Sequence, residues 1–79
     1  MNELQVFQYH GRDFRAIEQD GQPWFILSDV CRVLGLGTPS RVAERLDPDE
    51  KGMRQIHTPG GPQDMTIINE SGLYAVILR

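Results

Sequence analysis

Hydroxyl and guanidinium side chains gather in the middle of the sequence, where their spacing suits contact with nucleic acid. Thr38, Ser40 and Arg41 stand at the start of a predicted short helix, and Arg45 follows one turn later. In a helix-turn-helix, residues at the start of the second helix contact base edges. Arginine makes bidentate hydrogen bonds to guanine or phosphate. The pattern therefore indicates a DNA-reading helix.

Two further cations lie shortly after this helix. Lys51 and Arg54 are predicted to add contacts to the nucleic-acid backbone. The alternative interpretation is a solvated helix face, with Glu44 and Asp47 as counter-charges. Any two short helices joined by glycine resemble this outline, so the pattern alone leaves both interpretations open.

No group of residues in the sequence has the composition of a catalytic centre. The two histidines, His10 and His57, fall in a predicted turn and a predicted strand without a partner motif. Residues 47–50 lack the ligand spacing of a calcium loop and are interpreted as a solvated loop. Residues 59–62 (PGGP) precede no helix, which excludes a phosphate-binding loop. The sequence predicts neither an enzyme nor a bound metal or cofactor.

The first third of the chain is predicted to form a three-stranded antiparallel meander. Residues 4–9 alternate between apolar and polar, and residues 14–18 and 23–26 are rich in aromatic and branched side chains. A turn signal at residues 10–13 separates the first two strands. Asp20-Gly21 is a strong hairpin signal before the third.

Two short helices are expected next, because the apolar period changes from two to about 3.6 residues. Ser28 is predicted to cap a helix that begins at Asp29 and ends at Gly35. Cys31 falls on its apolar face and is interpreted as a small buried residue. Thr38 is expected to cap a second helix that runs to Leu46, with Pro39 as its first residue.

A β-hairpin and a last helix complete the expected α+β fold. Residues 53–58 and 64–68 are predicted to pair across the PGGP turn, and a loop is expected over residues 47–52. Asn69 is predicted to cap a helix with a wide apolar face. That helix is still apolar at Arg79 and has no capping signal, so we expect the single domain to be cut short there.

Size and charge limit the possible functions. The chain has 79 residues and a net charge of −3, which argues mildly against general nucleic-acid binding. Residues 28–57 carry five basic and five acidic side chains and are neutral, so the acidity lies in the flanks. No signal peptide or membrane-length apolar run is present, and a lone cysteine fits a reducing compartment. A cytoplasmic location with no membrane partner is predicted.

Several motifs in order resemble the Bro-N domain, found at the N-terminus of phage and prophage antirepressors and of baculovirus repeated-ORF proteins. The first is residues 21–36 (GQPWFILSDVCRVLGL), in which the G-x-P-W-F segment, D-V-C and leucine-glycine follow one another. The others are residues 49–52 (DEKG), 58–61 (TPGG) and 65–74 (MTIINESGLY). The similarity covers nearly the whole chain.

The resemblance implies a DNA-binding module of a transcriptional regulator that counters a phage repressor, acting in the cytoplasm of a bacterial host. It also implies that the domain continues past the position of Arg79. The competing hypothesis is a protein-interaction module that does not contact DNA. In that case the partner is a repressor, or a second copy that forms a homodimer through the apolar face of the last helix.

Overall fold

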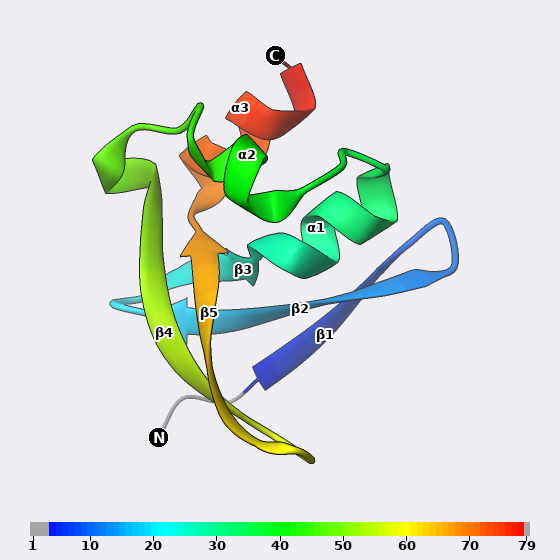
Figure 1. Cartoon of the computed structure of the whole chain (residues 1–79). Coiled ribbons are helices and arrows are strands. Elements are labelled where there is room, and N and C mark those ends of the chain that lie inside the picture. Colours follow the sequence, from blue (N-terminus) through cyan, green and yellow to red (C-terminus); the bar gives the residue numbers. More distant parts are fainter. Residues whose placement is uncertain (1–3, 79) are drawn as a thin grey trace.

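A computed structural model of the chain describes residues 4–78 (Figure 1). The elements follow in the order β1 (Leu4–Tyr9), β2 (Arg12–Gln19), β3 (Gln22–Ile26), α1 (Leu27–Leu34), α2 (Pro39–Ala43), the 3₁₀ turn η1 (Pro48–Glu50), β4 (Lys51–Thr58), β5 (Gly61–Ile68) and α3 (Glu70–Leu78). The predicted α+β class is confirmed, with its meander, two short helices, hairpin and last helix.

The meander is built by two tight turns. His10 and Gly11 have φ angles of 51° and 76°, and Asp20 and Gly21 have 54° and 76°. Two consecutive positive φ values define a type I′ turn, whose twist matches that of the flanking strands. Glycine takes the second position in each turn because it adopts positive φ without steric cost. The hairpin predicted from Asp20-Gly21 is therefore confirmed.

The meander and the later hairpin form one antiparallel sheet of five strands, in the order β1-β2-β3-β5-β4. Only two register pairs join the two halves, Phe25 with Ile68 and Ile26 with Ile67. The helices lie over one face of this sheet (Figure 1). The described part of the chain contains no helix with the length and apolarity needed to cross a membrane.

Two apolar clusters occupy the two faces of the sheet. The helix-covered face holds the main core: Ala16, Phe25, Leu27, Val30, Cys31, Val42, Leu46, Ile68, Ala75 and Val76. The opposite face buries Ile17, Ile26, Ile56 and Ile67. Ile17 lies on β2 and Ile56 on β4, which are separated by two strands. The sheet must therefore curve strongly, with this second face on its concave side.

Several boundaries differ from the sequence prediction: β2 and β5 begin before residues 14 and 64, and three further differences lie between the meander and the hairpin. Helix α1 begins at Leu27, so the predicted cap Ser28 lies inside the helix and Ile26 holds the N-cap position, because the buried face of the helix already starts at Leu27. Helix α2 ends at Ala43, and the chain continues to the buried Leu46 through a turn of i to i−3 hydrogen bonds. The expected loop over residues 47–52 contains η1, and β4 begins inside it.

Two predicted caps are confirmed, and a third residue holds the predicted position without the capping bond. Gly35 follows α1 with a φ of 67°. Thr38 precedes Pro39 in an extended conformation, but its side chain makes no capping hydrogen bond. Asn69 caps α3, since its Oδ1 accepts a hydrogen bond of 2.9 Å from the backbone N–H of Gly72. The prediction that Cys31 is buried is also confirmed, at 3% exposure.

Candidate nucleic-acid interface

The α2 segment, residues 38–46, carries four of the six predicted DNA-contacting residues, and all four are exposed: Thr38, Ser40, Arg41 and Arg45. The carbonyl of Thr38 accepts hydrogen bonds from the N–H groups of Arg41 and Val42, each 3.1 Å long. Thr38 itself makes no side-chain capping bond. Its hydroxyl is therefore not committed to holding the helix.

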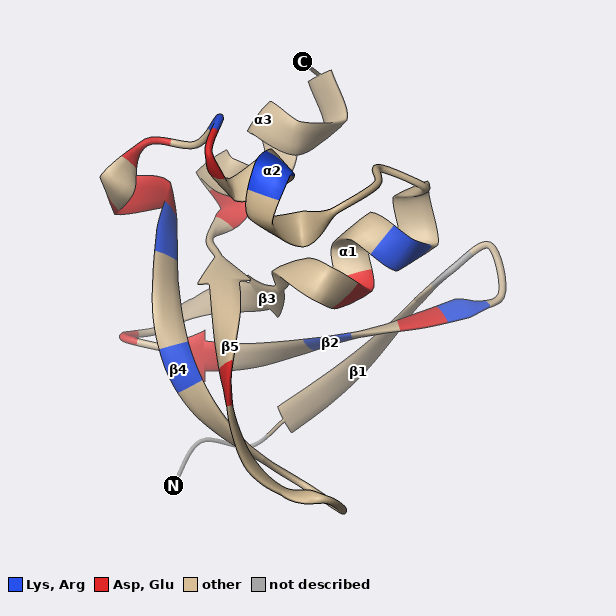
Figure 2. Ribbon diagram, in the orientation of Figure 1, with Lys and Arg blue, Asp and Glu red and all other residues tan. Residues whose placement is uncertain are grey.

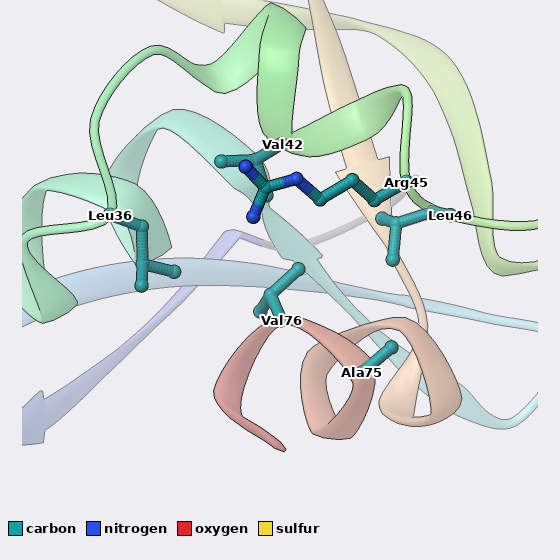
Figure 3. A pocket seen from close by; sticks show the side chains of 6 residues that line it. All are labelled: Leu36, Val42, Arg45, Leu46, Ala75 and Val76. Atoms are coloured by element: carbon teal, nitrogen blue, oxygen red, sulfur yellow. The ribbon is translucent and has the colours of Figure 1, made fainter. Parts of the chain in front are cut away.

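Buried side chains fix the α2 segment on the core. Val42 and Leu46 are each 5% exposed and belong to the main core. Arg45 lines a small hollow of about 40 Å³, together with Leu36, Val42, Leu46, Ala75 and Val76. Figure 3 shows the Arg45 side chain extending from the turn after α2 into the space between Val42 and Val76. The arginine stem thus covers apolar surface, as long charged side chains commonly do.

The side chains of Lys51 and Arg54 are less exposed than the sequence prediction of DNA-backbone contacts implied. Lys51 Nζ donates a 2.8 Å hydrogen bond to the carbonyl of Ala43, the last residue of α2. Arg54 donates to the side-chain amide oxygen of Gln19 on β2, across the concave face of the sheet. Both side chains are half-buried. Lys51 therefore holds the end of α2 against β4, and Arg54 links the two halves of the sheet.

The charges around the α2 segment are mixed. Residues 38–54 hold four basic side chains, and Glu44, Asp47, Asp49 and Glu50 balance them. Figure 2 shows blue and red segments alternating along the ribbon from α2 to β4. Three of the four acids are exposed, whereas Glu50 is buried. The surface is therefore not a basic stripe.

A buried ion pair that the sequence prediction missed joins helix α1 to strand β2. Asp29, 2% exposed, accepts three hydrogen bonds from Arg15: 2.9 Å from the backbone N–H, 2.7 Å from Nε and 2.9 Å from Nη2. Burial raises the pKa of Asp29, but the hydrogen bonds and charge of Arg15 outweigh it and hold that pKa below its usual value. The same contact raises the pKa of Arg15.

The position of this pair follows from unequal strand lengths. Strand β3 pairs with β2 only from Ala16 to Gln19, so the start of β2 has no neighbouring strand on that side. Helix α1 lies along this bare edge. Asp29 accepts from the N–H of Arg15, and Arg32 Nη2 donates to the carbonyl of Asp13 at 2.9 Å. Two helix side chains thus replace the hydrogen bonds of a missing strand.

A second buried carboxylate links η1 to α3. Glu50, 6% exposed, accepts a 3.0 Å hydrogen bond from the N–H of Asp47 and a 2.6 Å bond from the Ser71 hydroxyl. Asn69 Nδ2 donates to the carbonyl of Asp49 at 2.9 Å. The solvated-loop interpretation is therefore wrong for Glu50. Within residues 4–78, no His, Cys, Asp or Glu cluster has the arrangement of a metal site.

Comparison with known proteins identifies the scaffold that carries these residues. The sequence profile described as the BRO family, N-terminal domain, matches residues 13–79. The chain belongs to this family. This match confirms the resemblance noted in the sequence. Bro-N is a family of DNA-binding domains and not an enzyme family.

The relatives leave the role of the whole protein open. An uncharacterized protein of Haemophilus influenzae (strain Rd) is 32% identical over 83 residues, which cover 99% of this chain and 41% of that protein. The chain thus spans about two fifths of the length of this relative. No solved structure matches the chain.

The Bro-N domain also carries an apolar groove on its helical side, away from the α2 segment. Helices α1 and α3 and strand β2 line it with Phe14, Val30, Val33, Leu34, Leu73 and Ile77, around a volume of about 270 Å³. On α3, Tyr74, Ile77 and Leu78 are 59%, 51% and 80% exposed. The wide apolar face predicted for this helix is therefore only partly buried.

Proposed function

We propose that this Bro-N domain is the DNA-binding module of a phage or prophage antirepressor-type transcriptional regulator. Family membership supports DNA as the ligand. The observation that supports contact through the α2 segment is the exposure of Thr38, Ser40 and Arg41 together on a helix anchored by the buried Val42. A rigidly held helix start with hydroxyl and guanidinium groups suits base and phosphate contact.

The four predicted residues of the α2 segment contribute different groups to the proposed contact. Arg41 supplies the main charge, and Thr38 and Ser40 supply hydroxyl groups beside it. Arg45 contributes from the rim of the hollow, where its stem already lies against apolar side chains. An arginine whose stem is packed loses less conformational freedom when its guanidinium binds phosphate.

Lys51 and Arg54 take supporting roles. The Lys51 ammonium has three donors and gives one to Ala43, so it holds α2 and retains capacity for a phosphate. Arg54 contributes least, since its guanidinium turns toward Gln19. Removing Lys51 is expected to weaken binding partly by loosening α2.

A fluorescence anisotropy titration of labelled duplex and single-stranded DNA across a salt series tests the proposal. Each neutralised phosphate contributes about −0.9 to the slope of log K against log salt on duplex DNA. If Arg41 and Arg45 each neutralise one phosphate, Arg41→Ala makes the slope less steep by roughly 0.9, and the double variant by roughly 1.8.

Arg12→Ala is the matched control, because Arg12 is exposed on the β1–β2 hairpin and its removal changes the net charge equally. It should leave the slope close to that of the unsubstituted domain. Binding that is unchanged in both Arg41→Ala and Arg45→Ala would remove the α2 segment from the site. Equal weakening by Arg12→Ala would indicate a general charge effect.

The groove between α1 and α3 favours a second candidate function, a protein-interaction module that binds a repressor or self-associates without DNA. Its apolar lining and the exposed face of α3 suit an apolar partner segment. Failure to bind either form of DNA at low salt would favour this candidate. Ile77→Lys would then abolish the protein contact, since Ile77 lines the groove.

A further inference from the structure

Strand β1 leaves one edge of the sheet open. It is the first strand in the order β1-β2-β3-β5-β4 and pairs only with β2. Figure 1 shows β1 at the margin of the sheet, with no helix along its outer side. An open strand edge presents a row of backbone donors and acceptors that another extended strand can bind.

The register identifies which backbone groups face outward. The N–H of Arg15 donates to Asp29, on the side of β2 away from β1. Val6 pairs with Arg15, so this is a pair without direct hydrogen bonds, and the N–H and C=O of Val6 point away from β2. The same alternation turns the backbone groups of Leu4 and Gln8 outward. These three residues carry the bonding capacity of the edge.

The β1 edge lacks the usual protection against strand pairing. Residues 4–9 (LQVFQY) contain no charged residue, proline or glycine. Leu4, Val6 and Phe7 are 39%, 59% and 40% exposed. The other edge strand, β4, carries Lys51 and Arg54. Only one of the two sheet edges is therefore suited to pairing.

We propose that two copies of this chain pair through β1, antiparallel, about a two-fold axis at Val6. The outward groups of one copy then bond to those of the other, with Val6 opposite Val6 and Leu4 opposite Gln8. The strand is uncharged, so it meets its own copy without opposing like charges. A two-fold axis normal to the sheet keeps the concave faces of both copies on one side, and the sheet runs through the dimer.

This pairing is closed, because each copy has one such edge and uses it once. It does not rest on the proposed DNA function, and β1 lies outside residues 13–79, which match the family. It also differs from self-association through α3, because it uses backbone groups on the opposite part of the molecule (Figure 1).

Sedimentation equilibrium of the whole chain over a wide concentration range tests the proposal. The mass should rise from 9.0 kDa toward twice that value and stop. Val6→Lys places two ammonium groups opposite each other at the axis and should weaken pairing roughly tenfold or more. Met53→Lys, at a 66% exposed position on β4, adds the same charge at the other edge and should pair like the unsubstituted chain.

Amide hydrogen exchange of the unsubstituted chain provides a readout that needs no variant. The outward N–H groups of Leu4, Val6 and Gln8 should exchange more slowly as concentration rises, while those of Gln5 and Phe7 are slow throughout. A mass of 9.0 kDa at every concentration would overturn the proposal. So would a dimer that survives Val6→Lys and is lost in Ile77→Lys, because α3 would then form the contact. Growth beyond a dimer would also contradict it.

Discussion

The buried ion pair between Asp29 and Arg15 should contribute a large share of the stability of this small domain. Asp29→Asn preserves the shape of the side chain but removes its charge and sets an amide N–H₂ against the Arg15 guanidinium. Breaking a buried pair on one side costs about 3–5 kcal/mol. The Arg15 side chain is 31% exposed and can regain water, so we expect a loss of about 2–3 kcal/mol in the free energy of unfolding. A domain of 79 residues has roughly 4–12 kcal/mol in total.

The effect should depend on pH with a defined sign. The folded-state pKa of Asp29 lies below its unfolded value of about 3.9, so the ion pair stabilises the domain fully above that pH. Its contribution is lost as the pH falls from there through the folded-state pKa. The difference between the unsubstituted domain and Asp29→Asn should therefore be constant near neutral pH and shrink in acid.

Urea unfolding followed by the fluorescence of Trp24, the only tryptophan, measures both quantities. Arg32→Ala is the control: Arg32 Nη1 lies 3.8 Å from Asp29 Oδ1, and Nη2 donates to the carbonyl of Asp13. Because the contact with Asp13 is exposed and the Arg32 side chain is 63% exposed, its loss should cost less than about 1 kcal/mol. A loss below about 1 kcal/mol for Asp29→Asn at neutral pH would refute the reasoning. An undiminished loss in strong acid would show that its charge is not the cause.

Two predictions concern the junction of η1 and α3. Gly72→Ala should destabilise the domain by about 2 kcal/mol despite the better helix propensity of alanine, because the new Cβ would lie 2.8 Å from the carbonyl oxygen of Glu50. Thermal unfolding followed by circular dichroism measures this effect. A raised unfolding midpoint would contradict the prediction. Ser71→Ala removes the 2.6 Å hydrogen bond to the buried Glu50 carboxylate and should cost about 1–2 kcal/mol. Urea unfolding checks the second prediction, and an unchanged midpoint would show that other partners satisfy Glu50.

Local signals in the sequence predicted most of the elements. These signals depend only on residues close by in the sequence. They are the tight turns, the glycine after α1, the proline at the start of α2 and the Asn69 cap. Pattern reasoning can therefore detect them. The misplaced start of α1 has a tertiary cause, since Leu27 enters the helix because its side chain is fully buried.

The missing parts of the prediction are contacts between distant residues. Arg15 and Asp29 are 14 positions apart, and Glu50 and Ser71 are 21 apart. Neither pair has a spacing that sequence periodicity could reveal. The same limit applies to the candidate site. Exposure of Arg41 could be predicted from the helix pattern, whereas the bonds of Lys51 to Ala43 and of Arg54 to Gln19 depend on how the sheet curves.

The neutral net charge of residues 38–54, which include the α2 segment, connects the two proposals. A single domain with mixed charges around Arg41 neutralises few phosphates, so its electrostatic affinity for DNA is small. A dimer through β1 would join two such segments, and the two-fold axis would place both helix layers on the same face of the continuous sheet. The second contact would then be intramolecular and would raise the affinity without additional basic residues. An acidic domain could thus bind DNA specifically, because only a site with two suitably spaced halves would engage both copies.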